Sequence, residues 1–293
     1  MIQQTQITAL FGPAGNPGNF PYRSSAEAPR WLAGLGLDCY EYQCGRGVSI
    51  SETAAQRLGE EARTYGIQLS LHAPYYINLA NPAAESLQKN IRYILDSCRA
   101  AHWMGAERVV VHTGAVMKRS RREALNVALD SMREILRVWE GEGFSDVALC
   151  PETMGKINQL GDLDEVLEIC SLDERLIPCV DFGHLYARSL GELTGPDSCV
   201  FMLDRIETVL GPKRASRFHA HFSRIEFTQN GGEKCHRSFD DNGGFGPDPA
   251  PLMDEVAGRG WGPTFICESA GTQAGDALVM KELFQSAILK RKD

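Results

Sequence analysis

The sequence has no run of 18 uninterrupted apolar residues, and no charged segment leads into an apolar stretch near its start. It therefore shows neither a membrane span nor a secretory signal, and we expect a cytoplasmic protein. Basic residues are fewer than acidic ones, because 30 Lys and Arg stand against 38 Asp and Glu, a formal net charge of −8. This balance argues against a surface that is basic all over, so a nucleic acid would have to bind a local patch.

Cysteine and glycine motifs are missing as well. The nine cysteines are scattered, odd in number and without a CxxC pair, so we expect mostly reduced thiols in the core. No GxGxxG follows the first apolar run, and no linker, internal repeat or low-complexity segment divides the 293 residues. These absences disfavour an open doubly wound sheet, and we expect a single domain over residues 1–293.

Eight short apolar runs recur along the chain, separated by longer segments with helical periodicity. This alternation is typical of βα units, whose parallel strands are buried on both faces. Eight units predict an α/β protein with one closed (β/α)8 barrel, the TIM barrel fold. The predicted strands are Ile7–Phe11, Asp38–Gln43, Gln68–His72, Arg108–His112, Asp146–Cys150, Ile177–Val180, Arg217–His221 and Thr264–Cys267. The clearest predicted helices are Ala84–Ala101, Arg121–Glu140 and Asp276–Lys290, and a long Gly-rich polar connection is predicted at Asn230–Gly246.

Six successive predicted strands, the third to the eighth, carry His, Asp or Glu at or just after their ends. The chemistry of a (β/α)8 barrel lies at the C-terminal ends of its strands, and carboxylates that converge there repel unless cations or protons neutralise them. Imidazoles beside them favour a metal, with zinc the best match and manganese or iron possible. Six residues exceed the shell of one tetrahedral ion, so we expect at least two ions that share a carboxylate. The six are His72, His112, Glu152, Asp181, His219 and Glu268.

At these positions the sequence resembles the endonuclease IV family, metal-dependent endonucleases that cut DNA at abasic sites and are built on a (β/α)8 barrel. The resemblance covers most of the chain, and its most specific segment is His72-Ala73-Pro74-Tyr75-Tyr76-Ile77-Asn78-Leu79. It implies one zinc held by His72, His112 and Glu152, and a second zinc, bridged by Glu152. The ligands that it implies for the second zinc are Asp181, His219 and Glu268.

The family has a third zinc, and its ligands are matched only in part. His184 stands three residues after Asp181, and His236 stands in the loop after the seventh strand, but Lys234 occupies the position where the family has an acidic ligand. A protonated lysine cannot bind a metal. Two alternatives stay open: Glu233 takes the acidic role through a shifted loop, or the third ion is weaker, completed by water or absent.

The resemblance implies a zinc-dependent phosphodiesterase with two or three ions that hydrolyses DNA at abasic sites in DNA repair. The ions would neutralise the phosphate and supply a hydroxide near neutral pH. Glu152 would hold the ions together and Glu268 would orient the attacking water, so these two are the expected catalytic residues. Tyr75 and Tyr76 are candidates either for stacking on DNA or for packing at the barrel rim, and Arg46 either for a phosphate contact or for a surface charge.

A second function fits the same strand ends. Sugar isomerases and epimerases of the xylose-isomerase-like barrel group use Glu, Asp, His and Glu on strands five to eight, which hold one divalent ion while two carboxylates move a proton. His72 and His112 distinguish the two interpretations, because an epimerase with one metal does not need them. A metal-dependent binding protein without turnover is a third alternative. His221 shares a strand face with His219 and is expected to be structural or to support a ligand.

Overall fold

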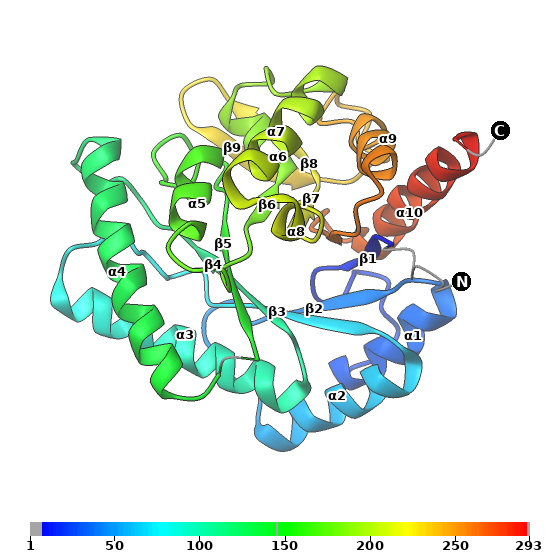
Figure 1. Ribbon diagram of the computed structural model, residues 1–293. Helices are drawn as coiled ribbons and strands as arrows, with labels where there is room; N and C mark the ends of the chain where they lie inside the picture. Colours follow the sequence, from blue (N-terminus) through cyan, green and yellow to red (C-terminus); the bar gives the residue numbers. More distant parts are fainter. Residues whose placement is uncertain (1–7, 145, 292–293) are drawn as a thin grey trace, which may run out of the picture.

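The computed structural model describes residues 8–144 and 146–291 of the chain. Eight parallel strands form one sheet in the order β1-β10-β7-β6-β5-β4-β3-β2, and helices surround it (Figure 1). The two ends of this sheet meet, because the Asp38 amide donates to Phe11 O at 2.9 Å and the Gly15 amide donates to Glu41 O at 2.8 Å. The predicted (β/α)8 barrel is therefore confirmed.

The strands of the barrel agree closely with the predicted runs. They are β1 (Leu10–Pro13), β2 (Cys39–Gln43), β3 (Gln68–His72), β4 (Arg108–His112), β5 (Ala148–Glu152), β6 (Cys179–Asp181), β7 (His219–Phe222) and β10 (Thr264–Cys267). Three strands have the predicted bounds, whereas β5, β6 and β7 each begin two residues later. Ile7, the predicted start of the first strand, lies outside the described residues.

The helices begin and end where local sequence signals favour it. Ser120 precedes α4 and accepts a hydrogen bond from the Glu123 amide, while the Glu123 carboxylate accepts one from the Ser120 amide, which together form a capping box. The helices are η1 (Ser25–Glu27), α1 (Ala28–Leu35), α2 (Glu52–Tyr65), α3 (Ala84–Met104), α4 (Arg121–Gly141), α5 (Leu163–Cys170), α6 (Phe182–Arg188), α7 (Gly195–Leu210), α8 (Pro212–Ala215), α9 (Ala250–Arg259) and α10 (Gln273–Lys290).

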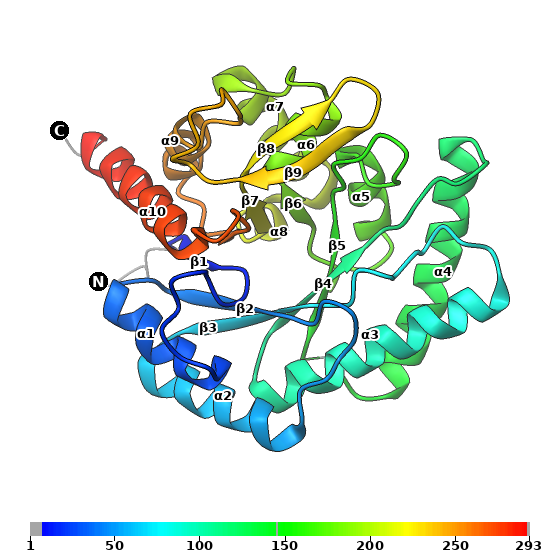
Figure 2. The ribbon, with the colours of Figure 1, turned by 180° about the vertical axis from the view of Figure 1, so that it is seen from behind.

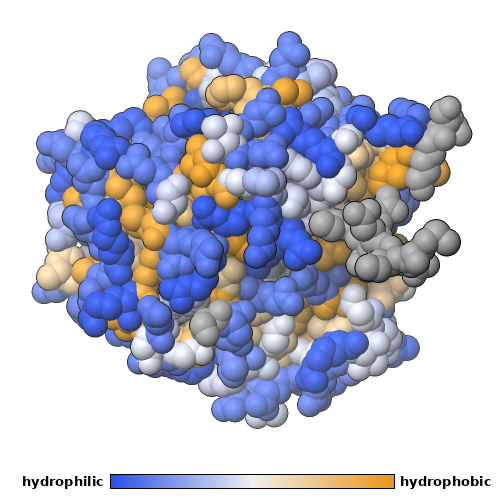
Figure 3. Space-filling view, viewed as in Figure 1, coloured by the Kyte–Doolittle hydropathy of each residue, from blue (hydrophilic) through white to orange (hydrophobic). Residues whose placement is uncertain are grey.

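The core fills the space between the strands and the helices, where residues such as Leu71, Trp139 and Phe265 are buried. Hydrophilic side chains cover most of the face seen in Figure 3, with smaller hydrophobic areas between them. Among the described residues, no helix is both long enough and apolar enough to span a bilayer.

An antiparallel hairpin of β8 (Arg224–Thr228) and β9 (Gly232–Arg237) follows β7 and lies outside the barrel sheet (Figure 2). The sequence predicts only an irregular connection at Asn230–Gly246, so the strand β9 within it is a correction. The polar segment Gly232–Arg237 lacks the apolar alternation that would predict a strand. It pairs because β8 supplies the partner for its main chain.

Candidate metal centre

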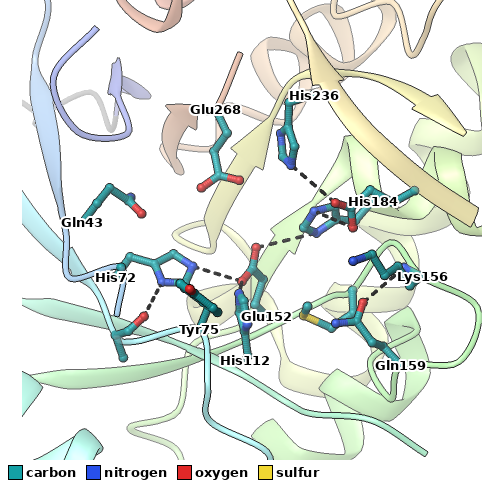
Figure 4. Close-up of a pocket in the computed structure, with 14 residues that line it drawn as sticks. Gln43, His72, Tyr75, His112, Glu152, Lys156, Gln159, His184, His236 and Glu268 are labelled. Atoms are coloured by element: carbon teal, nitrogen blue, oxygen red, sulfur yellow. Dashed lines mark hydrogen bonds and ion pairs between the residues drawn. The ribbon is translucent and has the colours of Figure 1, made fainter. Parts of the chain in front are cut away.

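A polar pocket of about 320 Å³ opens where the barrel strands end (Figure 4). Loops after several strands line it, together with the hairpin of β8 and β9. The lining residues that can bind a metal are His72, His112, Glu152, His184, Glu233, His236 and Glu268. The other polar side chains that line it are Gln43, Tyr75, Lys156 and Gln159.

Glu152 lies at the centre of the site, at the end of β5 and opposite His112 of β4 in the sheet register. Its Oε2 lies 3.2 Å from Nε2 of His112 and 3.3 Å from Nε2 of His72, whereas its Oε1 lies 3.0 Å from Nδ1 of His221. Burial alone would raise the pKa of Glu152, but the charge of His221 and hydrogen bonds from the surrounding imidazoles hold it well below its usual range. Two oxygens that face separate imidazoles can bridge two ions.

A second cluster joins Glu152 to Asp181, His221 and Glu268, whose ligand atoms all lie within 4.8 Å of one another. Asp181 ends β6 and stands opposite His221 in the register with β7. Its Oδ1 accepts a hydrogen bond of 2.7 Å from the His184 amide, whereas its buried Oδ2 receives none from the described part of the chain and has Nδ1 of His184 3.3 Å away. Burial raises the pKa of Asp181. A buried carboxylate oxygen without a donor fits a cation.

His221, and not His219, lies with the carboxylates of the second cluster, whereas the ligand atoms of His219 lie near those of Cys179 and His221. His219 lies two residues earlier on the strand, deeper in the barrel, and its Nε2 hydrogen-bonds Glu41 Oε2 at 2.9 Å. The resemblance implies His219 as a ligand of the second ion, and the sequence gives His221 a structural or supporting role, whereas in the structure His221 is the histidine of this cluster. Both side chains face the interior, so alternation alone cannot tell them apart. Which of the two reaches the second cluster depends on where β7 begins. The strand begins two residues later than predicted, so His219 is its first residue and His221 lies nearer its C-terminal end.

A third cluster consists of His184, Glu233 and His236. Glu233 Oε2 lies 3.6 Å from Nε2 of His184, and its Oε1 lies 3.8 Å from Nε2 of His236. Lys234 turns away from the cluster and pairs with Glu226. Of the two alternatives that the sequence leaves open, this arrangement matches the first, in which Glu233 takes the acidic role.

A β-bulge places Glu233 in the third cluster. In the hairpin register Glu226 stands opposite Cys235 and Phe227 stands opposite Glu233, which leaves Lys234 as an extra residue. Strict alternation would put the lysine on the same face as the histidine two residues later. The bulge shifts the alternation by one residue, so Glu233 shares that face and the lysine points away.

Two glycines let the hairpin approach the loop after β5. The Glu233 amide donates to Gly155 O at 3.1 Å. A Cβ at Gly155 would lie 2.7 Å from Cβ of Glu233 and 2.9 Å from Cδ2 of His184. Gly232 has a φ of +73°, and a Cβ there would lie 2.4 Å from Gly155 O. The third cluster thus depends on a close approach that side chains at these positions would prevent.

In three of these histidines Nδ1 is hydrogen-bonded to a neutral group, although Nδ1 of His184 also lies 3.3 Å from Oδ2 of Asp181. Nδ1 of His72 and Nδ1 of His184 lie 2.7 and 2.8 Å from main-chain carbonyl oxygens, and Nδ1 of His236 lies 2.8 Å from Ser223 Oγ. A carbonyl oxygen can only accept a hydrogen bond, so the proton of the neutral ring sits on Nδ1 in His72 and His184. Nε2 is then free to face the carboxylates, as a metal ligand requires.

Two of these imidazoles are basic for histidines. Burial alone would lower the pKa of His72, but its hydrogen bond to Glu152 and the charge of that carboxylate raise it to about 9. Burial would likewise lower the pKa of His184, which the charges of Asp181 and Glu233 raise to about 9. Protons on these rings balance the buried carboxylates, and a metal would have to displace them.

Glu41 is a buried residue that was not predicted from the sequence. Its carboxylate lies inside the barrel on β2, 2.9 Å from Nε2 of His219 and 3.0 Å from Nε2 of His221. Burial alone would raise the pKa of Glu41, but the charge of His221 and the hydrogen bond from His219 hold it well below its usual range. One signal in the sequence could have indicated it: Glu41 is a carboxylate within a predicted strand and lies two residues before Gln43, so both side chains are on the same face of that strand.

The residues predicted to contact DNA lie at the rim of the pocket. Tyr75 and Tyr76 are 44% and 53% exposed, their rings lie 4.4 Å apart, and Tyr75 lines the pocket. The hydroxyls of Tyr75 and Tyr76 share a hydrogen bond of 3.1 Å. This contact and the neighbouring Arg46 lower the pKa of Tyr75, so the three candidates lie together. Lys156, which was also not predicted from the sequence, lines the same pocket and forms no ion pair with any described carboxylate.

Comparison with known proteins gives the following relatives. A profile of the xylose isomerase-like TIM barrel family matches residues 29–285. An uncharacterized protein from Methanocaldococcus jannaschii is 33% identical over 278 residues, which cover 94% of this chain and 97% of that protein. A probable endonuclease 4 from Streptomyces avermitilis is 28% identical over 221 residues, which cover 73% of this chain and 68% of that protein. The predicted resemblance is confirmed by these matches.

Solved structures share the fold with this chain. Endonuclease IV from Thermus thermophilus has a TM-score of 0.66 at 16% identity, covering 96% of this chain and 99% of the other. A D-tagatose 3-epimerase-like protein has a TM-score of 0.71 at 18% identity, covering 97% of this chain and 100% of the other. Both groups thus have the same barrel, and the overall fold does not choose between their activities.

Proposed function

We propose that this chain, which belongs to the xylose isomerase-like TIM barrel family, is a multinuclear zinc-dependent phosphodiesterase that cuts DNA at abasic sites. The observation that carries this proposal is the position of Glu152 between two groups of imidazoles. His72 and His112 meet one of its oxygens and His221 meets the other. A carboxylate in this position is suited to hold two ions near one another, as in hydrolases that use two metals.

The alternative is an epimerase with one metal, for which the cluster of Glu152, Asp181, His221 and Glu268 would suffice. That function leaves His72 and His112 without a role. It also leaves the third cluster unexplained. A free cation at the rim, Lys156, suits a phosphate better than it suits an uncharged sugar.

The donors fit the proposed metals. Imidazole and carboxylate donors suit zinc, with manganese or iron as alternatives. Four groups of ligand atoms among the described residues lie close enough to share an ion, and the three that include a carboxylate account for two or three ions. When bound, such ions neutralise phosphate oxygens and lower the pKa of a bound water to about 7.

The side chains of the pocket have distinct proposed roles. Glu152 and Asp181 hold the centre together, since both are buried. Glu268 is partly exposed at the pocket surface, where it can orient the attacking water and accept its proton. Lys156 is placed to hold a non-bridging phosphate oxygen.

DNA is the proposed partner on the strength of the rim. Tyr75 and Tyr76 offer aromatic surface beside the pocket, on which a base or sugar can stack, and Arg46 adds a cation beside them. The relatives named endonuclease 4 support the same substrate. The net charge of −8 means that this local patch would have to supply the affinity.

The test combines metal content with activity. Elemental analysis of protein purified without added metal is expected to give two or more zinc equivalents. The wild type is expected to cleave an abasic-site duplex, and Glu268→Gln to lose this cleavage by a factor of about 100 or more. Glu168→Gln serves as the control, because Glu168 pairs with Arg122 on the surface and should leave cleavage unchanged. One zinc equivalent with ketose epimerisation and no cleavage would favour the epimerase.

A further inference from the structure

The imidazole of His221 differs from the other imidazoles of the metal centre in the group that lies beside the ring nitrogen facing away from the proposed ions. His72 and His184 are held by carbonyl oxygens, and His236 is held by a hydroxyl. Nε2 of His221 instead lies 3.0 Å from Oε1 of Glu41, a carboxylate with no exposed surface, but not in the direction of a hydrogen bond, so this buried nitrogen has no hydrogen-bond partner among the described residues. Its Nδ1 faces Glu152 and Glu268 at 3.0 and 3.5 Å.

The carboxylate of Glu41 is held on both of its oxygens. Ser70 Oγ donates to Oε2 at 2.9 Å, and Nε2 of His219 lies 2.9 Å from the same oxygen. Gln43 Nε2 donates to Oε1 at 3.0 Å, the oxygen that faces His221. A buried carboxylate with this many partners has one orientation, so the direction in which it faces His221 is fixed.

Arg108 determines which nitrogen of His219 carries the proton, and so the direction of the hydrogen bond between His219 and Glu41. A guanidinium nitrogen of Arg108 lies 3.4 Å from Nδ1 of His219, and the other donates to Arg217 O at 3.0 Å. A guanidinium only donates, so Nδ1 of His219 must accept. The proton of this neutral imidazole is then on Nε2, from which it is donated to Glu41.

We propose that Glu41 is a positioning residue: a small rotation of the His221 ring brings its Nε2 proton onto Glu41 Oε1, 3.0 Å away, and leaves Nδ1 to the metal, while His219 and Arg108 hold Glu41 in place. The proposal rests on the metal centre described under the proposed function. A carboxylate behind a ligand histidine fixes the orientation of the ring and raises its basicity, and the loss of such a partner costs about 10- to 100-fold in metal affinity. His219, which is not a ligand of the second cluster, acquires a role in this way.

The experiment measures zinc affinity, which does not depend on turnover. Zinc retained by wild type, Glu41→Gln and Ser223→Ala is measured by elemental analysis at free-zinc concentrations set by competing chelators. Glu41→Gln, of nearly the same shape, is expected to weaken one zinc equivalent about 10- to 100-fold. Ser223→Ala removes the neutral partner of His236 and is expected to weaken a different equivalent, so the double variant should show both shifts. Unchanged zinc affinities in a folded Glu41→Gln protein would overturn the proposal.

A second measurement needs no variant at Glu41, in case that variant fails to fold. Nitrogen NMR of ¹⁵N-histidine in the zinc-loaded wild type is expected to show His221 with zinc on Nδ1 and the proton on Nε2. Zinc on Nε2 of His221 would overturn the proposal. A wild type that binds no zinc would overturn the proposed function as well. A wild type that binds zinc, with the same zinc affinity in Glu41→Gln, would overturn only the inference.

Discussion

The Gly155→Ala substitution is expected to remove the third zinc and leave the other ions bound. The new Cβ would lie 2.7 Å from Cβ of Glu233 and 2.9 Å from Cδ2 of His184. Carbon atoms in contact prefer about 3.5–4.0 Å, so the neighbours must move by about 1 Å. The Cβ of Glu233 is fixed by the hairpin main chain and cannot swing away as the end of a side chain would. Ligand distances tolerate only about 0.2 Å, so the third ion should be lost.

The same overlap should also reduce stability. Overpacking of this kind costs about 1–3 kcal/mol in the free energy of unfolding. Gly275→Ala is the matched control, because Gly275 has a negative φ within α10 and no atom within 4 Å of an added Cβ. It should bind the wild-type amount of zinc and be stabilised by about 0.5–1 kcal/mol.

The assay is zinc per protein by elemental analysis after dialysis, together with urea unfolding of each variant. Gly155→Ala is expected to hold one equivalent fewer than the wild type. If it keeps the full zinc complement and the wild-type stability, the close approach of the hairpin to the loop after β5 does not determine the third site.

Three further predictions concern other parts of the centre. Lys156→Met is expected to raise KM for the DNA substrate about 10-fold with little change in kcat, because it removes one charge-assisted hydrogen bond. Steady-state kinetics in which kcat falls and KM does not rise would contradict this. In the metal-free protein His72 and His184 have a pKa of about 9, above the value of about 6.5 expected in the unfolded chain, so their stabilisation is complete below pH of about 6.5 and is lost as the pH rises through about 9. The Tm of that protein should fall across this window while its zinc affinity rises, and a flat Tm would refute the assignment. Replacing Tyr75 and Tyr76 with Ala should weaken binding of abasic DNA by about 1–3 kcal/mol per stacked base in a fluorescence titration, and unchanged affinity would assign both rings to rim packing.

The fold could be predicted because the barrel repeats one pattern eight times. Short runs such as Gln68–His72 and Thr264–Cys267, whose buried residues lie between a polar first residue and the mouth of the barrel, were predicted with both ends correct. Strands β5, β6 and β7 begin later than predicted, because Val147, Ile177 and Phe218 before them are apolar as well and no local signal marks the start of the ladder.

The ligands could be predicted only as far as residue type and strand end determine them. His72, His112 and Glu152 end neighbouring strands, and the register sets His112 opposite Glu152 and His72 opposite Val110. The choice between His219 and His221 depends on depth along the barrel axis. That depth is a property of the register between strands, which one sequence does not encode locally.

The third cluster shows how a register change can preserve a site while its motif disappears. In the resembling family the acidic ligand and the histidine stand two residues apart, which places both on one face of a regular strand. Here Glu233 and His236 stand three residues apart, and in a regular strand they would face opposite sides. The bulge at Lys234 takes one residue out of the alternation and brings them back to the same face. The lysine at the expected ligand position is therefore no sign that the cluster is lost, because the inserted residue carries its charge outward to Glu226.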